Sequence, residues 1–286
     1  MTLPEELILN GKAITSLPED IGELTTLKRL SLFQNQLASL PQVFWQLTSL
    51  QTLNLGDNRL TEISDEIGNL VELQMLDLGH NDLAALPPSI GKLPHLRFLY
   101  VSNNRLSELP DSLAELNSLI YLNASDNRLT TLPPGLGQLD HLLELRLYNN
   151  QLASLPDSVG QMTSLRELHL MRNRLTSLPD SLGNLPALRI LDLEGNQITS
   201  LPDSTGQLST LTALNLRGNA LETIPTSLGQ LKNLRRLDLR ANRLQTLPDS
   251  LAELPHLEKL DLRWNEFSPL PRWLAWLEQR GCVVYW

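Results

Sequence analysis

The sequence has a single cysteine, Cys282, among 286 residues. One thiol cannot form a disulfide within its own chain, so the disulfide-closed repeat domains that are common outside the cell are excluded. Long apolar runs are also missing, because Leu7–Leu9 is far too short for a membrane span or for the apolar core of a signal peptide. We therefore expect no membrane insertion and a cytoplasmic location, or export without a cleaved signal peptide.

Positive charge and aromatic side chains are both in short supply. The net charge is -9 at pH 7, whereas a general nucleic-acid binder or a protein attracted to anionic lipid needs a basic surface. Neither kind of partner is expected. Aromatic residues make up only 5% of the chain, so a surface on which several of them meet would be informative.

Motifs that carry chemistry are missing as well. The sequence has no phosphate-binding loop, no GxSxG, no kinase signature, no HExxH and no CxxC. His95, His141 and His256 lie 46 or more residues apart and do not form a ligand set. We predict no enzyme activity, no catalytic residue, no metal site and no cofactor.

What the chain does contain is a strict internal period. An asparagine recurs every 23 residues with no insertion or deletion. The recurring residues are Asn35, Asn58, Asn81, Asn104, Asn127, Asn150, Asn173, Asn196, Asn219, Asn242 and Asn265. One step earlier the register falls on Lys12. Fixed self-similarity of this kind indicates stacked supersecondary units, so the prediction is one continuous elongated domain.

Each unit reads LxxLxLxxNxLxxLPxx(I/L)GxLxx, as in residues 188–208. The two leucines of Leu-x-Leu point to one side of a short strand and the residue between them points to the other. Successive strands then form a parallel sheet with a leucine core on one side and an open face on the other. The asparagine amide can bridge to the backbone of the neighbouring coil. The stretch after Leu-Pro is short and interrupted by glycine, which predicts a single helical or 3-10 turn.

This pattern resembles the leucine-rich repeat in its 23-residue, Leu-Pro-containing form. The resemblance covers residues 3–280 and implies an α/β fold, a right-handed, curved solenoid with the parallel sheet on its concave face and the short turns on its convex face. Scribble-like scaffolds, the plant intracellular Ras-group-related proteins and many bacterial proteins share the motif. It therefore implies signalling scaffolds, and a small GTPase of the Ras group as one kind of partner. The regularity of the repeat and the end of the chain are most similar to the bacterial members.

The ends of a solenoid need covering, because a repeat alone cannot bury its leucines. We divide the single domain into an N-terminal capping partial repeat (1–26), the repeats (27–270) and a C-terminal helix–strand cap (271–286). The cap sequence predicts a helix over Arg272–Arg280, stopped by Gly281, and then a short edge strand. We expect Trp273, Trp276 and Trp286 to shield the last leucine layer. The alternative is that these rings form a docking site.

The open face carries an unusual group of residues in the middle of the chain. Its members fall on neighbouring predicted strands: Met75, Phe98, Tyr100, Tyr121 and Tyr148, with Arg146, His169 and Met171 beside them. These residue types carry much of the binding energy at protein interfaces. The pattern predicts a partner-binding surface. The alternative is that the rings pack on one another and stabilise the sheet.

A second group lies further along the same face. It consists of Arg217, Arg240 and Arg263, and each of the last two follows an aspartate two residues earlier. The arginines are suited to bind carboxylates of a partner. The equally consistent alternative is a surface lattice whose charges neutralise one another within the chain.

These observations favour a non-enzymatic module that binds a protein or an extended peptide on the concave face, as a scaffold or a bacterial effector. One alternative is the targeting half of a larger effector enzyme, a ubiquitin ligase or a kinase. Another is a structural protein that associates with itself through the aromatic group, although we expect a monomer.

Overall fold

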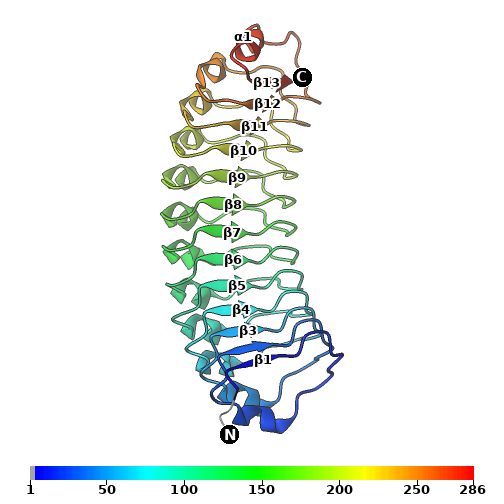
Figure 1. Cartoon of the computed structure of the whole chain (residues 1–286). Helices are drawn as coiled ribbons and strands as arrows, with labels where there is room; N and C mark the ends of the chain where they lie inside the picture. The colour runs from blue at the N-terminus through cyan, green and yellow to red at the C-terminus, as the bar shows by residue number, and fades with distance from the viewer. Residues whose placement is uncertain (1–3) are drawn as a thin grey trace. The chain divides into compact units, whose positions relative to one another are not determined.

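The computed structural model describes residues 4–286, and these divide into two compact units between Leu142 and Leu143. Each unit is a stack of coils, and a typical coil contributes one short strand to a parallel sheet and one 3-10 turn to the opposite side (Figure 1). This is the sheet-and-turn arrangement that the 23-residue pattern predicts.

The first unit contains β1 to β6 within its described residues. These strands are Glu6–Ile8, Arg29–Ser31, Thr52–Asn54, Met75–Asp77, Phe98–Tyr100 and Tyr121–Asn123. The 3-10 turns η1 to η6 are Glu19–Glu23, Gln42–Gln46, Asp65–Asn69, Pro88–Lys92, Asp111–Glu115 and Pro134–Gln138. Neighbouring strands pair residues one period apart, as in Met75 with Phe98 and Asp77 with Tyr100. Residues that are 23 positions apart in the sequence therefore lie side by side on neighbouring strands and form columns across this sheet.

The second unit contains β7 to β13 and a terminal helix. The strands are Glu144–Arg146, Glu167–His169, Ile190–Asp192, Ala213–Asn215, Arg236–Asp238, Lys259–Asp261 and Val283–Tyr285. The 3-10 turns η7 to η11 are Asp157–Gln161, Asp180–Asn184, Asp203–Gln207, Thr226–Gln230 and Asp249–Glu253, and α1 is Leu274–Gln279. Each 3-10 turn of the protein follows a proline, except that η3 follows Ser64, whose hydroxyl accepts a hydrogen bond from the Glu66 amide at 3.2 Å.

The repeated leucines form the core of each unit. Leu53 and Leu55 in and after β3 are fully buried, and the same holds for the equivalent pair Leu168 and Leu170 in and after β8. The open-face residues between the leucines of each pair, Asn54 and His169, keep part of their surface accessible. Burial of about 25 cal/mol for each Å² of apolar surface makes this leucine column the main source of stability.

The periodic asparagines form the predicted ladder. In the first unit, the Asn58 Nδ2 donates to the carbonyl oxygens of Leu32 and Leu55, both at 3.0 Å, and its Oδ1 accepts from the Leu37 amide at 3.0 Å. Leu32 and Leu37 belong to the preceding coil, so one buried side chain ties two coils together. Unpaired backbone groups would otherwise be left where the chain leaves the sheet.

The 3-10 turns of neighbouring coils pack so closely that their glycines leave no space for a side chain. A Cβ on Gly91 would lie 2.3 Å from the Ser112 carbonyl oxygen in the next coil. One coil has Ala114 in place of this glycine, and there the facing residue of the next coil is Gly135. A Cβ on Gly135 would lie 3.1 Å from the Ala114 Cβ, so the missing side chain on one coil makes room for the methyl group of the other.

The C-terminal segment has the predicted helix followed by a strand. Gly281 has a φ of +89° and donates to the Glu278 carbonyl at 2.9 Å, while the Cys282 amide donates to the Leu277 carbonyl at 3.1 Å. These two bonds form a Schellman motif, which ends α1 at a glycine because only glycine adopts a positive φ without strain. Strand β13 then pairs with β12.

The expectation for the tryptophans of this segment is wrong in part. Leu274 and Leu277 are buried against the last coil, whereas Trp276 and Trp286 are 46% and 64% exposed. The helix turns its leucines inward at a spacing of three residues, which leaves Trp276 on its outer side. The Arg280 guanidinium lies 4.5 Å from the centre of the Trp276 ring.

Candidate functional site

The open face of the first unit contains the predicted aromatic group on β4, β5 and β6. Met75, Phe98, Tyr100 and Tyr121 are all half-buried and lie on neighbouring strands. The Tyr100 and Tyr121 ring centres are 5.0 Å apart with the planes at 39°. We call these four residues the aromatic patch. As the repeat register predicted, these four residues lie outside the leucine core.

Charged groups border the aromatic patch. The Arg97 guanidinium lies 5.8 Å from the centre of the Phe98 ring, within range of a cation–π contact. Asp77, which pairs with Tyr100 across the sheet, is largely shielded from water. This burial raises its carboxyl pKa above the ordinary value of 3.8, although the Gly79 amide and His80 act in the opposite direction. The patch therefore combines rings with a positive and a negative group.

The other predicted members lie in the second unit. Arg146 and His169 occupy the open faces of β7 and β8, and Tyr148 and Met171 follow those strands. Tyr148 and Met171 are half-buried and line a hollow of about 250 Å³ together with Asn149, Arg172 and Glu194.

The arginine column is paired with carboxylates of its own chain. Arg263 donates from Nε and Nη2 to the two oxygens of Asp261 at 2.9 and 2.7 Å. Arg240 contacts Asp238 in the same way, and its Nε lies 3.5 Å from Asp261 Oδ2. Arg217 lies 3.4 Å from Glu194. The lattice of internally neutralised charges is therefore present, and binding of a partner by these arginines stays a prediction.

Asp261 is the buried centre of this lattice. Its side chain has no exposed surface. Burial alone would raise its carboxyl pKa, but the hydrogen bond from Arg263 and the positive charges of Arg240 and Arg263 outweigh that effect and lower the pKa below 3.8. The ionised carboxylate fixes both guanidiniums against the sheet.

Profiles of two repeat families match the chain. The leucine-rich repeat region matches residues 88–180 and 178–268, and the leucine rich repeat matches residues 5–60, 25–83 and 48–106. A leucine-rich repeat protein of Leptospira interrogans has 39% identical residues and a TM-score of 0.91, and the match covers 99% of this chain and 72% of that one. The chain belongs to the leucine-rich repeat family.

Two further leucine-rich repeat structures are complexes. The plant peptide hormone receptor RGFR1 in complex with RGF2 has 29% identity and a TM-score of 0.68, with 93% of this chain and 52% of that chain covered. The Drosophila Toll–Spätzle complex has 26% identity and a TM-score of 0.87, with 98% and 43% covered. This chain thus spans about half the length of those two proteins or less. No match to a curated protein sequence was found.

The leucine-rich repeat sheet has a further residue on its open face, Tyr285, which the sequence analysis missed. Tyr285 of β13 pairs with Asp261 of β12, and the Arg263 guanidinium lies 4.9 Å from the centre of its ring. The Lys259 Nζ lies 5.4 Å from the same ring. The pairing of β12 with β13 is offset by 24 residues, as in Lys259 with Val283, so a search by the 23-residue period does not place Tyr285 on the open face.

A small hollow lies on the leucine-rich repeat sheet between β9 and β12. It measures about 200 Å³ and lies over Ala213, whose side chain is shorter than those of Ile190 and Arg236 on the neighbouring strands. Asp192 and Asp238 line one side, and Arg236 and Lys259 line the other. Burial raises the carboxyl pKa of Asp192 above 3.8, and the hydrogen bonds from the Glu194 amide and the Asn215 side chain oppose this.

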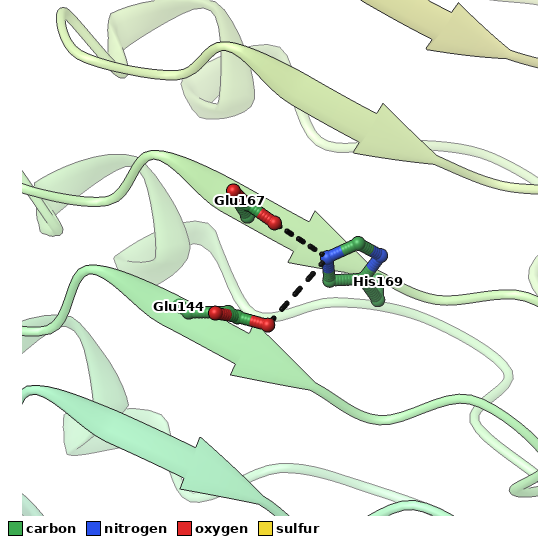
Figure 2. A group of neighbouring side chains, drawn as sticks. All are labelled: Glu144, Glu167 and His169. Atoms are coloured by element: carbon green, nitrogen blue, oxygen red, sulfur yellow. Dashed lines mark hydrogen bonds and ion pairs between the residues drawn. The ribbon is translucent and has the colours of Figure 1, made fainter.

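The second unit also brings together three potential metal ligands. Glu144, Glu167 and His169 each offer one donor atom, and these atoms lie within 4.8 Å of one another (Figure 2). The prediction of no metal site considered the spacing between histidines and the absence of HExxH and CxxC, and did not consider pairs of neighbouring strands. The signal that could have found the group is that Glu144 and Glu167 share one column and His169 follows in the next.

Two remaining features bear on function. Cys282 is buried, and burial raises the pKa of its thiol above 9.0, which disfavours the reactive thiolate. Among residues 4–286, no helix has both the length and the apolar character that crossing a membrane requires.

Proposed function

We propose that this leucine-rich repeat protein binds a protein or an extended peptide on the open face of its sheet, with the aromatic patch as an anchor. The fold generally mediates protein–protein interaction. The observation that carries the proposal is the tyrosine pair: two rings 5.0 Å apart that retain accessible surface on neighbouring strands.

The residue types and their burial support this role. Tyrosine, phenylalanine and methionine bury a large area on binding at a small cost in side-chain entropy, and tyrosine adds a hydrogen-bonding group. Met75, Phe98, Tyr100 and Tyr121 are already partly ordered by their neighbours, so little freedom remains to be lost when a partner covers them. Clusters of such residues at the centre of an interface carry most of its binding energy.

The complexes among the structural relatives also support a protein or peptide as the partner. RGFR1 is in complex with RGF2, and Toll is in complex with Spätzle. We infer the same general class of partner for this chain. A role as a signalling scaffold or bacterial effector, and a small GTPase as partner, are finer forms of the proposal that rest on the resemblance described above.

A cytoplasmic location and a monomeric state complete the proposal. The single buried thiol of Cys282 is compatible with a reducing compartment because the chain has no disulfide to form. The protein acts in this proposal as a recognition module, whether alone or as the targeting part of a larger protein.

A comparative pull-down tests the proposal. Tagged wild-type protein, a Tyr100→Ala/Tyr121→Ala double variant and an Ile8→Ala control are incubated with lysate of the source organism, and bound proteins are quantified by mass spectrometry. Ile8 is a matched control because it is an apolar residue on the same open face, 52% exposed on β1. We expect proteins that bind the wild type and the control but not the double variant. Identical sets on all three would refute the role of the patch.

A further inference from the structure

Glu144, Glu167 and His169 form a compact group on the open face of the second unit. His169 Nε2 lies 3.1 Å from Glu167 Oε2 and 3.9 Å from Glu144 Oε1. Figure 2 shows Glu167 and His169 side by side on one strand and Glu144 on the adjacent strand, with both carboxylates directed at the same ring nitrogen. All three side chains are partly shielded from water.

These distances are close to those of ligand atoms around one small metal ion. Zinc binds histidine nitrogen and carboxylate oxygen at about 2.0–2.2 Å in a tetrahedral arrangement, which puts two ligand atoms about 3.4 Å apart. The two measured separations, 3.1 and 3.9 Å, lie on either side of that value. The three donor atoms all lie within 4.8 Å of one another, so shifts of about an ångström in the glutamate side chains would bring them into one coordination sphere.

The backbone fixes this geometry. Glu144 and Glu167 are directly paired across β7 and β8, and His169 is two residues after Glu167, so it points to the same face. Like charges directly opposite on neighbouring strands destabilise a sheet. The pairing of two glutamates is therefore unfavourable unless a cation lies between them.

The chain supplies only part of the positive charge that this group needs. Arg146 lies 2.5 Å from Glu144. Within residues 4–286, no lysine or arginine forms an ion pair with Glu167, which instead contacts His169. Asp192 pairs with His169 across the sheet and adds another carboxylate to its surroundings. With neutral imidazole, the acidic groups around His169 outnumber the nearby basic ones.

We propose that Glu144, Glu167 and His169 form a binding site for one divalent transition-metal ion, with zinc as the fitting ion. A nitrogen and two carboxylate oxygens suit zinc, whereas magnesium and calcium prefer oxygen ligands alone. The ion lies between His169 and the two glutamates and offsets the repulsion between the glutamates. Three protein ligands leave a fourth position for water on the open face.

Calorimetric titration of chelator-treated protein with zinc chloride at pH 7.5 tests the site. We expect one equivalent of zinc per wild-type chain, and binding weakened at least about 10-fold in His169→Ala and in Glu167→Gln, since loss even of outer-shell partners costs that much. His256→Ala is the matched control, because His256 is exposed on another coil, and it should bind as the wild type does. Millimolar magnesium should not compete.

Thermal unfolding gives a second readout from the same samples. Zinc should raise the midpoint of the wild type and of His256→Ala and leave that of His169→Ala unchanged. Circular dichroism checks that each variant is folded. Absence of zinc binding to the wild type, or equal affinity in His169→Ala, would overturn the proposal.

Discussion

The rings of Tyr100 and Tyr121 lie 5.0 Å apart on the open face, on the neighbouring strands β5 and β6. Neither ring belongs to the leucine core, and each remains partly accessible. Their contact with each other stabilises the sheet modestly, since a cross-strand aromatic pair contributes about 0.2–1 kcal/mol. A central interface tyrosine commonly contributes about 2 kcal/mol or more to binding. A variant that loses more binding free energy than unfolding free energy therefore indicates a binding role, and equal losses indicate a structural one.

Replacement of Tyr100 or Tyr121 by alanine should therefore affect binding more than stability. We expect the affinity for a protein recovered in the pull-down to fall by about 30-fold, equivalent to about 2 kcal/mol, while the free energy of unfolding falls by less than about 1 kcal/mol. Phe98→Ala and Tyr148→Ala should behave in the same direction. Titration of the partner and urea unfolding measure the two effects, and equal losses in both would assign the rings a structural role.

The asparagine ladder should respond in the opposite way. Asn173 Nδ2 donates to the carbonyls of Leu147 and Leu170 at 2.9 and 3.0 Å, and its Oδ1 accepts from the Leu152 amide at 3.0 Å. Asn173→Ala leaves the buried Leu152 amide unpaired, whereas the Leu147 and Leu170 carbonyls still accept from Asn150 and Asn196. An unsatisfied buried group costs about 1–3 kcal/mol, and we expect the free energy of unfolding to drop by about that amount in urea titrations.

The neighbouring Arg174→Ala provides the control for that measurement, because Arg174 is exposed and only one residue away. It should change stability by less than about 0.5 kcal/mol. Partner affinity measured at temperatures where both variants are folded should match that of the wild type. An unchanged unfolding curve for Asn173→Ala would show that the ladder does not stabilise this coil.

The buried carboxylate of Asp261 predicts a pH-dependent stability difference. Because its pKa is lowered in the folded protein, its contribution is present above the ordinary value of 3.8 and is lost as the pH falls through the lower folded pKa. Asp261→Asn removes the charge that holds Arg263, whereas Arg240 keeps Asp238, and we expect a loss of about 1–2 kcal/mol at pH 7. The difference from the wild type should shrink below pH 3.8 in urea unfolding series.

Asp77 provides a comparison in which the pKa shift, and therefore the pH dependence of stability, has the opposite sign. Burial raises its pKa, so the ionised form is disfavoured in the folded protein at neutral pH, and this penalty disappears as the pH falls below 3.8. Asp77→Asn keeps an oxygen that can accept the hydrogen bond from the Gly79 amide. It should be slightly more stable than the wild type at pH 7 and lose that advantage in acid. The same pH response in both variants would contradict the assignment of the shifts.

The glycines of the 3-10 turns should tolerate a side chain least where the backbone of the next coil lies against them. A Cβ on Gly183 would lie 2.3 Å from the Ser204 carbonyl oxygen. Gly183→Ala should therefore destabilise by about 2 kcal/mol, the usual cost of overpacking. Gly135→Ala would place its Cβ 3.1 Å from the Ala114 Cβ, a milder clash with a side chain instead of the backbone, and should destabilise by less, about 1 kcal/mol. Differential scanning calorimetry of both variants checks the contrast.

The period allowed the architecture to be predicted because it determines the strand register. Met75, Phe98 and Tyr121 occupy paired positions on β4 to β6 since each repeat has the same length, and the same logic places the ladder asparagines. Side-chain orientation within the columns was harder to predict. The pairing of Arg263 with the buried Asp261 depends on the rotamers of both side chains, and the repeat pattern carries no information about rotamers.

The predictions failed or were incomplete where the period changes or where two columns combine. Tyr285 was missed because the β12–β13 pairing has an extra residue. The helix buries Leu277 and exposes Trp276, a choice that depends on the rotation of α1 about its axis. The group at His169 combines residues from two columns on two strands, and a search for spaced histidines does not detect it.

The pairing of Ala114 with Gly135 limits how such a chain can grow. Repeats multiply by duplication of a stretch of gene, and most coils here present a glycine to the serine of the next, so a copy inserted between them meets a compatible neighbour. A copy of the coil that contains Ala114 is different, because its methyl group needs a residue without a side chain on the following coil. Duplication of that coil together with its successor keeps the methyl group opposite a glycine, whereas duplication of that coil alone would place it opposite a serine.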